Sequence, residues 1–260
     1  GSASITFKDD AKVINDADNI LTFPSIDDDT DSSHNTCNTT DCTVSGGTAP
    51  ALSLPSFTTT GSSTEITIDS GSSTLGSGGD FDTHEAKKLE VKNSGQLTFL
   101  TSSTDYVFSE AKFENESKIT FNPGVYWFDS LEIKNETEIT VNGPVTIYVN
   151  QHFDIQNEAQ VNAGGNASNL AIIAYAELHL KNTVQVNAVL YGVGSDVRLE
   201  NEAKLTGAIS ASNEVELKDN AQVTFSDVSS VQIADLCDAQ STQVDHYRII
   251  HDGAGQTCAS

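Results

Sequence analysis

Clustered carboxylates are the residues of this sequence that come closest to a ligand-binding motif. Asp27, Asp28, Asp29 and Asp31 lie together in the run IDDDTD. Calcium prefers carboxylate oxygens, so this run could hold Ca²⁺. It lacks the glycine and the distal glutamate of an EF-hand loop, however, and a solvated acidic loop is the simpler interpretation. We expect no obligatory cofactor, with Ca²⁺ as the one candidate ion.

Motifs for catalysis are missing from the sequence. It contains no GxSxG, HExxH or phosphate-binding loop, and none of its six histidines falls into a triad pattern. Enzymes that cleave acidic polysaccharides on a β-helix need clustered carboxylates and a basic group. Only Arg198 and Arg248 are available as arginines. The sequence favours a protein that is not an enzyme and predicts no catalytic residue.

Four cysteines form two local pairs, Cys37 with Cys42 and Cys237 with Cys258. An even number of closely spaced cysteines predicts two disulfides and an oxidising compartment. Three connectivities are open in principle, and we favour the local one because an elongated fold would hold the two ends of the chain apart. A zinc site is the weaker interpretation, since neither pair has CxxC spacing.

The charge balance restricts the partners. The chain has 13 basic and 37 acidic residues, which give a formal net charge of -24. Such a surplus repels nucleic acids and anionic bilayers. The longest apolar run, residues 170–176, is far shorter than the ~20 residues that a membrane-spanning helix requires. We therefore expect neither a nucleic-acid partner nor membrane insertion.

A repeat predicts the elements that position these side chains. Each copy has an apolar-x-apolar pair, a charged or amide residue, Asn or Asp, and a second alternating apolar stretch. A period of 18 to 25 residues suits one coil of a β-solenoid, in which stacked coils build a shared core. An earlier stretch, ITFKDDAKVIN from Ile5, matches VELKDNAQVTF from Val215 and predicts a further coil. The seven copies begin at Leu89, Ala111, Leu131, Phe153, Leu178, Val197 and Val215.

The pattern within a copy predicts three strands. Leu131 and Ile133 point inward on the first strand, a second strand follows the Asn corner, and a third apolar strand such as VTIYV from Val145 precedes the next copy. The predicted fold class is all-β: a right-handed parallel β-helix with about 20 residues and three strands per coil, a disulfide-pinned N-terminal insertion and a C-terminal cap. The expected parts are an N-terminal coil or cap strand (1–21), an Asp/Ser/Thr-rich insertion (22–64), the β-helix (65–226), and a C-terminal cap with the start of a further module (227–260).

The corners and outer positions predict regular ladders. Asn tolerates left-handed backbone, so stacked Asn corners should form an amide ladder. Outward positions of the first strand alternate in charge and predict a lattice of ion pairs. On the second strand a column of Thr and Asn could bind glycans or ice, although strand propensity explains the same residues without a ligand. The corner residues are Asn93, Asn115, Asn135, Asn157, Asn182, Asn201 and Asp219.

Aromatic residues gather on the third strand. If Val125, Trp127, Ile147 and Val149 belong to the core, alternation places their aromatic neighbours outside. Exposed aromatic rings need a partner, and sugar rings stack on them. The candidate ligand-binding residues are therefore Tyr126, Phe128, Tyr148 and Tyr175. The alternative is that the insertion 22–64 lies across this face and buries the rings.

Several stretches resemble the MshQ family, which belongs to the mannose-sensitive haemagglutinin (MSHA) type IV pilus. They are GVYWFDSLEIKNETEITVNGPVTIYVNQHFDIQN, NAGGNASNLAIIAYAELHLKN, NAVLYGVGSDVRLENEAKLTGAIS and DHYRIIHDGAGQTC, with CNTTDCTVSGG and LPSF ahead of the repeats. The resemblance implies a secreted, cell-surface or pilus-associated protein of a Gram-negative bacterium, with its solenoid near the amino terminus. Members are described as biogenesis factors or tip adhesins, and the family supplies no catalytic motif.

These observations together predict a non-enzymatic adhesin module, pilus-associated or on the cell surface. We expect it to bind a glycan or a host or environmental surface through one face of the solenoid. The first alternative is a structural scaffold that docks minor pilins at the pilus tip. The second is a β-helix enzyme that degrades polysaccharides.

Overall fold

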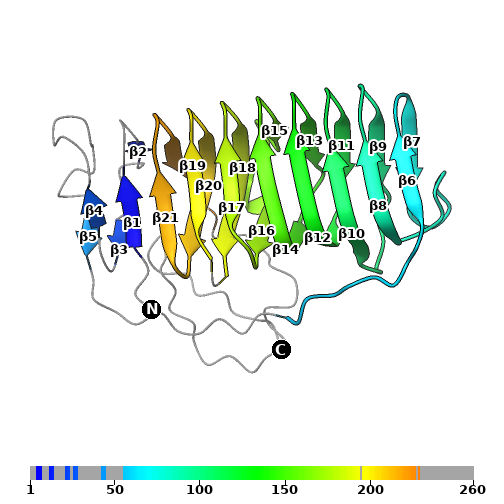
Figure 1. The fold of residues 1–260 in the computed structure, drawn as a ribbon, viewed down its shortest axis with the longest axis horizontal. Coiled ribbons are helices and arrows are strands. Elements are labelled where there is room, and N and C mark those ends of the chain that lie inside the picture. Colours follow the sequence, from blue (N-terminus) through cyan, green and yellow to red (C-terminus); the bar gives the residue numbers. More distant parts are fainter. Residues whose placement is uncertain are drawn as a thin grey trace.

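The computed structural model describes residues 55–193, 195–226 and 228, together with five short strands nearer the amino terminus. The described chain is all-β and forms a parallel β-solenoid of about eight turns (Figure 1). Its one helix is a 3-10 turn, η1 (Ala167–Asn169). The five short strands are β1 (Ser4–Phe7), β2 (Lys12–Ile14), β3 (Leu21–Phe23), β4 (Ile26–Asp28) and β5 (Cys42–Val44).

Three columns of strands form the walls of the solenoid, and we name them the charged, hydroxyl and apolar faces. The charged face contains β6 (Glu65–Ile68), β8 (Glu85–Val91), the second halves of β10 (Tyr106–Phe113), β12 (Gly124–Lys134) and β14 (Val145–Gln156), then β17 (Leu178–Lys181), β19 (Val197–Glu200) and β21 (Glu214–Leu217). The hydroxyl face contains β7 (Ser72–Leu75), β9 (Gln96–Phe99), β11 (Lys118–Phe121), β13 (Glu138–Val141), β15 (Gln160–Val161), the first halves of β18 (Gln185–Gly192) and β20 (Lys204–Ala211), and β22 (Gln222–Phe225). The apolar face contains the first halves of β10, β12 and β14, then β16 (Leu170–Ala174) and the second halves of β18 and β20.

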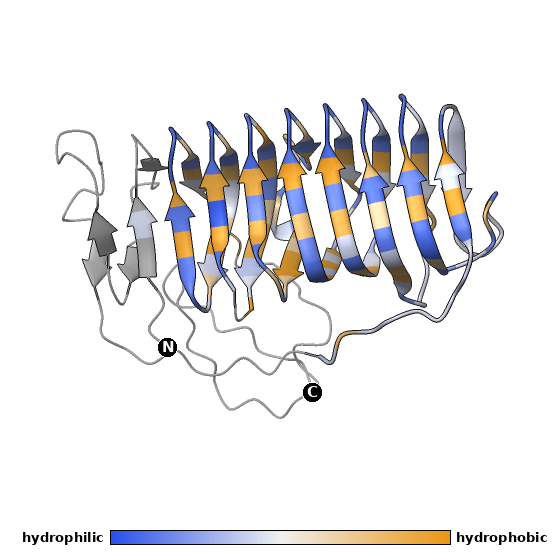
Figure 2. Cartoon of the chain, in the orientation of Figure 1, coloured by the Kyte–Doolittle hydropathy of each residue, from blue (hydrophilic) through white to orange (hydrophobic). Residues whose placement is uncertain are grey.

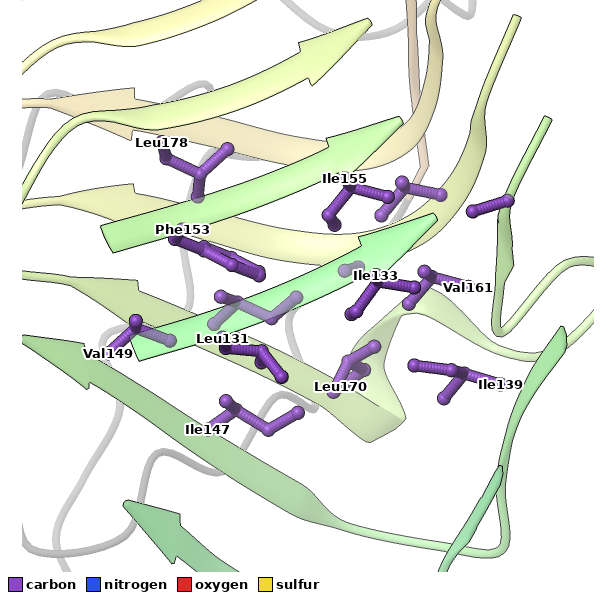
Figure 3. Packing of buried hydrophobic residues seen from close by; sticks show 14 of the residues in the cluster. Leu131, Ile133, Ile139, Ile147, Val149, Phe153, Ile155, Val161, Leu170 and Leu178 are labelled. Atoms are coloured by element: carbon purple, nitrogen blue, oxygen red, sulfur yellow. The ribbon is translucent and has the colours of Figure 1, made fainter. Parts of the chain in front are cut away.

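Equivalent positions of successive repeats lie opposite one another. Ala111 pairs with Leu89 on one side and with Leu131 on the other, and Leu178 pairs with Phe153. Parallel strands stack about 4.8 Å apart, so each repeat position becomes a column along the axis. The inward positions of these columns fill the lumen with Leu, Ile, Val and Phe side chains (Figure 3). The inward positions predicted for the first strand, such as Leu131 and Ile133, are confirmed, because both residues are buried in this core.

Polar and apolar residues alternate along the strands of the charged face, and the corners at one edge of the molecule are hydrophilic (Figure 2). This alternation is what a sheet with one wet and one dry side requires. The lumen is therefore the core, and the outer sides of the walls are the surfaces on which a partner can be recognised.

The first coil in the sequence is not the first coil in the stack. Strand β1 pairs with β21, with Ile5 opposite Val215, and β2 pairs with β22, with Val13 opposite Val223. The N-terminal coil, made of β1 and β2, therefore stacks beyond the last repeat, and β4 lies on its other side (Figure 1). The repeat array itself starts at the opposite end, at β6. We call residues 55–60, which lead toward β6, the strap.

Some expected features fall outside the described residues. Cys37, Cys237 and Cys258 are not described, and Cys42 is described only as the backbone that begins β5. Asp29 and Asp31 are likewise not described, and Asp27 and Asp28 are described only as backbone of β4. The disulfides and the calcium site thus stay predictions.

Candidate functional site

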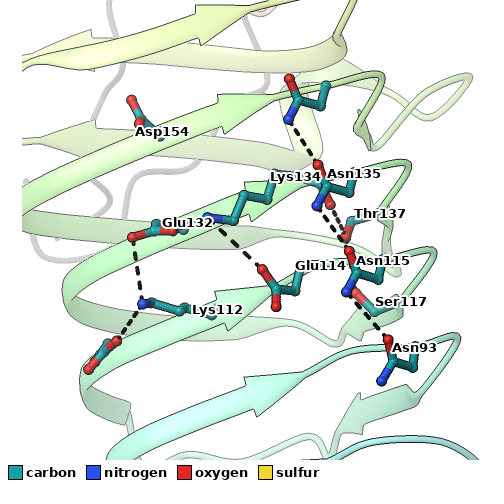
Figure 4. A network of polar contacts seen from close by, with 12 residues as sticks. Asn93, Lys112, Glu114, Asn115, Ser117, Glu132, Lys134, Asn135, Thr137 and Asp154 are labelled. Carbon is teal, nitrogen blue, oxygen red and sulfur yellow. Dashed lines mark hydrogen bonds and ion pairs between the residues drawn. The ribbon is translucent and has the colours of Figure 1, made fainter.

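An amide ladder runs along the corner between the charged and hydroxyl faces. Asn135 Nδ2 donates to Asn115 Oδ1 at 2.9 Å, and Asn157 Nδ2 donates to Asn135 Oδ1 at 2.9 Å (Figure 4). Each of these asparagines has positive φ, for example 55° at Asn135, which Asn adopts more readily than most residues. The predicted ladder is confirmed from Asn93 to Asn201, but among the described residues it does not reach Asp219. It joins Asp69, Asn93, Asn115, Asn135, Asn157, Asn182 and Asn201.

The charged face carries the predicted lattice of ion pairs. Lys134 Nζ lies 2.5 Å from Glu132 and 4.0 Å from Glu114, and Lys112 Nζ lies 3.0 Å from Glu110 and 3.9 Å from Glu132 (Figure 4). These pairs are partly exposed, so each stabilises the fold by about 0–1 kcal/mol. Because the charges neutralise one another, this face has little left to offer a charged partner.

Two glutamates of the lattice have shifted pKa values. Burial alone would raise the pKa of Glu132, but the hydrogen bond from Lys134 and the charge of Lys112 outweigh it and lower the pKa below its usual 4.5. At Glu200, burial is likewise outweighed by the hydrogen bond from Lys218 and by His179, whose Nε2 lies 2.6 Å from the carboxylate. Both carboxylates are therefore stabilised in their charged form by folding.

The lowered pKa of Glu200 predicts a pH-dependent effect of the Glu200→Gln substitution. A carboxyl group whose folded pKa is depressed contributes stability above its unfolded pKa and loses it as the pH falls through the folded pKa. We expect Glu200→Gln to lower Tm at pH 7, and the difference from wild type to shrink as the pH is taken below 4.5, the usual value. Thermal unfolding by circular dichroism at several pH values measures this.

A matched control is Glu136→Gln on the exposed corner, because Glu136 makes no ion pair with another described residue. Its Tm should follow wild type at every pH. A Tm difference for Glu200→Gln that stays constant from pH 7 to pH 3 would show that the lattice does not hold Glu200 in its charged form.

The hydroxyl face carries hydrogen-bonding side chains in register. Thr98 pairs with Thr74 on one side and with Thr120 on the other, and Thr120 pairs with Thr140. The column is interrupted at Asn162, which is buried and donates to backbone carbonyls. It resumes with Asn187, Thr206 and Thr224 at the other end. Among the described residues, the hydroxyls of Thr98, Thr120 and Thr140 have no hydrogen-bond partner. They are available to a ligand.

A second outward column on the same face lies two residues before the Thr or Asn position of each strand. Lys118 and Glu138 neutralise each other in it at 2.7 Å. The remaining members are mostly amides, so the hydroxyl face is close to neutral although the whole chain is acidic. This second column consists of Gln96, Lys118, Glu138, Gln160, Gln185, Lys204 and Gln222.

The apolar face corrects one expectation. Tyr126 and Phe128 are 0% exposed and point into the lumen, so the prediction that they form an outer strip is wrong. The Tyr126 hydroxyl donates to the Asn122 carbonyl at 2.7 Å, and burial raises the pKa of Tyr126. Trp127, expected in the core, lies on the outer side instead. The cause is that β12 is apolar at consecutive positions, so alternation could not tell its two sides apart.

Tyr148 and Tyr175 do lie on the outer side of the apolar face, but they are covered. Tyr148 is fully buried and stacks on Trp127, with ring centroids 4.1 Å apart. Tyr175 is half-buried; its hydroxyl donates to the Pro55 carbonyl at 2.7 Å, and burial raises its pKa. Phe57 meets Trp127 edge-on at 5.4 Å and Tyr175 at 5.9 Å.

The strap, which is the described end of the insertion 22–64, therefore covers part of this face, in line with the expectation that the insertion lies across it. The residue that sequence reasoning missed is Phe57. Its signal was the stretch LPSF, an apolar cluster within a polar insertion.

Within the described residues no group of three or more His, Cys, Asp or Glu side chains is arranged to hold a metal ion. In that same part of the chain, no helix is long and apolar enough to cross a bilayer.

Comparison with known proteins adds one finding. Residues 129–228 match a family described as a domain of unknown function (DUF7305). This segment begins within β12 and ends just beyond β22, so the match covers the later coils. No curated protein and no solved structure matches the chain.

Proposed function

We propose that this chain is a non-enzymatic adhesin module that binds a glycan or an environmental or host surface through its hydroxyl face. The observation that supports this proposal is the in-register column of free threonine hydroxyls on that face. The charged face is self-neutralised and the apolar face is partly covered by the strap. The hydroxyl face is thus the wall on which open donors and acceptors repeat along the axis.

A repetitive ligand suits such a wall. Each coil offers one or two weak hydrogen-bonding side chains, and a polymer or a dense surface can engage many of them at once, so the contacts reinforce one another. The net charge of -24 disfavours anionic polymers. We therefore expect the ligand to be a neutral glycan.

The resemblance to the MshQ family supports a secreted, pilus-associated location in a Gram-negative bacterium, and we include it in the proposal. The right-handed winding and the local disulfides Cys37–Cys42 and Cys237–Cys258 belong to the proposal as well. A second candidate function, a scaffold that docks minor pilins, is favoured by the apolar face, where Tyr191 and Val193 are only partly buried.

A glycan array with a threonine-to-valine variant tests the adhesin proposal. Valine matches threonine in shape and favours strands, so the variant Thr98→Val/Thr120→Val/Thr140→Val should fold with an unchanged Tm. We expect wild type to bind a neutral glycan and this variant to bind it at least about tenfold more weakly, because several hydrogen bonds are lost.

Thr67→Val serves as the matched control, because Thr67 is an exposed threonine on the charged face. Its binding should equal that of wild type. Equal binding by the triple variant, or no glycan bound by wild type, would contradict the proposal. Retention of pilins in a pull-down by a protein that binds no glycan would favour the scaffold.

A further inference from the structure

The apolar face differs from the other two walls in being apolar on both sides. Its inner side contributes to the lumen, and its outer side carries a column of apolar and aromatic residues in register. A sheet that is apolar on both sides requires a cover on the outside. The outer column runs through Val107, Trp127, Tyr148, Ile173 and Tyr191.

The strap supplies part of this cover with few contacts. It passes from Tyr175, which binds the Pro55 carbonyl, over Trp127, which meets Phe57, to Glu85, which accepts from Thr60 Oγ1. Among the described residues its backbone forms no sheet pairing, and Ser56, Thr58 and Thr59 are exposed. Among the described residues, one aromatic ring and two side-chain hydrogen bonds join the strap to the face.

We propose that the aromatic strip formed by Trp127, Tyr148, Tyr175 and Tyr191 is a recognition site for an extended peptide of another protein. The peptide carries a proline followed two residues later by an aromatic residue. The strap, with Pro55 and Phe57, is the built-in occupant of this site. Aromatic grooves that recognise extended proline-containing segments work in this way, with rings packing on the peptide and a Tyr or Trp donor binding a backbone carbonyl.

The geometry of the rings favours a peptide over a sugar. Sugar stacking needs an open ring face, but the rings of Trp127 and Tyr148 stack on each other with an interplanar angle of 13°. Phe57 accordingly meets Trp127 edge-on, at 83°. The indole Nε1 donates to Asp105 at 2.8 Å, whereas the Tyr175 hydroxyl donates to the strap. Its observed acceptor is a peptide carbonyl.

Part of the strip remains partly exposed. Tyr191 and Val193 pack against the same cluster but are only partly buried. Tyr191 follows Ile173 in the column, on the side away from Trp127. Because these two side chains stay partly exposed, a peptide that makes the strap's contacts can also pack against them. That surplus allows a partner to displace a segment that is tethered beside its own site.

The fluorescence of Trp127 can report binding at the strip, because Trp127 is the single tryptophan of the chain. The experiment uses the full chain with Phe57→Ala, which removes the strap's ring without changing the strip. The probe is the synthetic peptide LSLPSFTTT, the sequence of residues 52–60. We expect a saturable change in tryptophan emission with this peptide and none with LSLPSSTTT, in which serine replaces the phenylalanine.

Two comparisons sharpen the test. Wild type should bind LSLPSFTTT at least about tenfold more weakly than Phe57→Ala, because the tethered strap competes for the strip. Adding Tyr175→Phe to Phe57→Ala should weaken binding roughly 2- to 10-fold, the effect of one lost hydrogen bond. Thr67→Val in the Phe57→Ala background should bind like Phe57→Ala alone.

The proposal is overturned if Phe57→Ala gives no emission change with the peptide, or if the serine peptide binds equally well. It is also overturned if wild type binds as tightly as Phe57→Ala, since the strap would then not occupy the site. None of these outcomes depends on the hydroxyl face, so glycan binding can succeed or fail independently.

Discussion

Tyr126→Ala is expected to destabilise the solenoid by about 3–5 kcal/mol, the range for deleting a large buried aromatic side chain. The Tyr126 ring is fully buried in the lumen and stacks on Tyr106, with centroids 5.1 Å apart and planes 4° apart. It also meets Phe99 and Phe121 edge-on. Removing it leaves a cavity in the middle of this aromatic stack. Urea denaturation followed by circular dichroism gives the free energy of unfolding.

Tyr126→Phe is the control for the ring itself. It keeps the packing and loses only the hydrogen bond to the Asn122 carbonyl, so it should cost about 1 kcal/mol. If Tyr126→Ala costs no more than Tyr126→Phe, the ring does not lie in the core.

Asn135→Ala should cost about 2–5 kcal/mol. The substitution removes two ladder hydrogen bonds, one to Asn115 and one from Asn157, each contributing about 0.5–1.5 kcal/mol. It also forces alanine into left-handed backbone, with φ of 55°, at a cost of about 1–2 kcal/mol. Urea denaturation measures the total.

Two further variants separate these contributions. Asn135→Gly loses the ladder bonds but adopts positive φ freely, so it should be less destabilising than Asn135→Ala. Asn142→Ala loses one bond, to Asn122, at a position without positive φ, and should cost only about 1 kcal/mol. Equal losses for Asn135→Ala and Asn135→Gly would show that left-handed backbone contributes nothing at this corner.

The first two strands of each coil could be predicted because their patterns are simple. One side is dry and the other wet, so apolar and polar residues alternate, and the Asn corner marks where each strand ends. The amide ladder and the ion-pair lattice follow from that register. For these two walls the sequence contains enough information to assign inside and outside.

The third strand could not be assigned in the same way. In β14 the assignment was right, with Ile147 and Val149 in the core; in β12 it was reversed. Tyr126 pairs with Ile147, so pairing the two strands settles the question, but the pairing is irregular between Phe128 and Ser130. Because of this irregularity, the inward and outward positions of the charged-face half of β12 cannot be counted back into its apolar-face half. Because the strap packs on the outer side of the apolar face, that wall is apolar on both sides, and the alternation of polar and apolar residues is lost.

The place of the N-terminal coil in the stack depends on the whole chain and could not be predicted from a short stretch of sequence. The match between the stretch from Ile5 and the stretch from Val215 predicted a coil, and these two stretches do pair in register. Nothing in the match said that the coil would stack on that repeat rather than start the array at β6. The strap across the apolar face is a consequence of this arrangement, because the chain has to reach β6 at the far end.

Because β1 pairs with β21, the first strand of the chain takes its place in the fold only after the last repeat has been made. The contact between Thr6 and Glu214 joins residues 208 positions apart, so Ser4–Phe7 leaves the ribosome early and its partner strand is synthesised late. The coils from β6 onward can stack on their predecessors while translation proceeds. The amino-terminal segment has to wait for the last of them. In a nascent chain that has not reached β21, this segment has no strand to pair with. The N-terminal coil can therefore stack on the array only after the last repeat has been made.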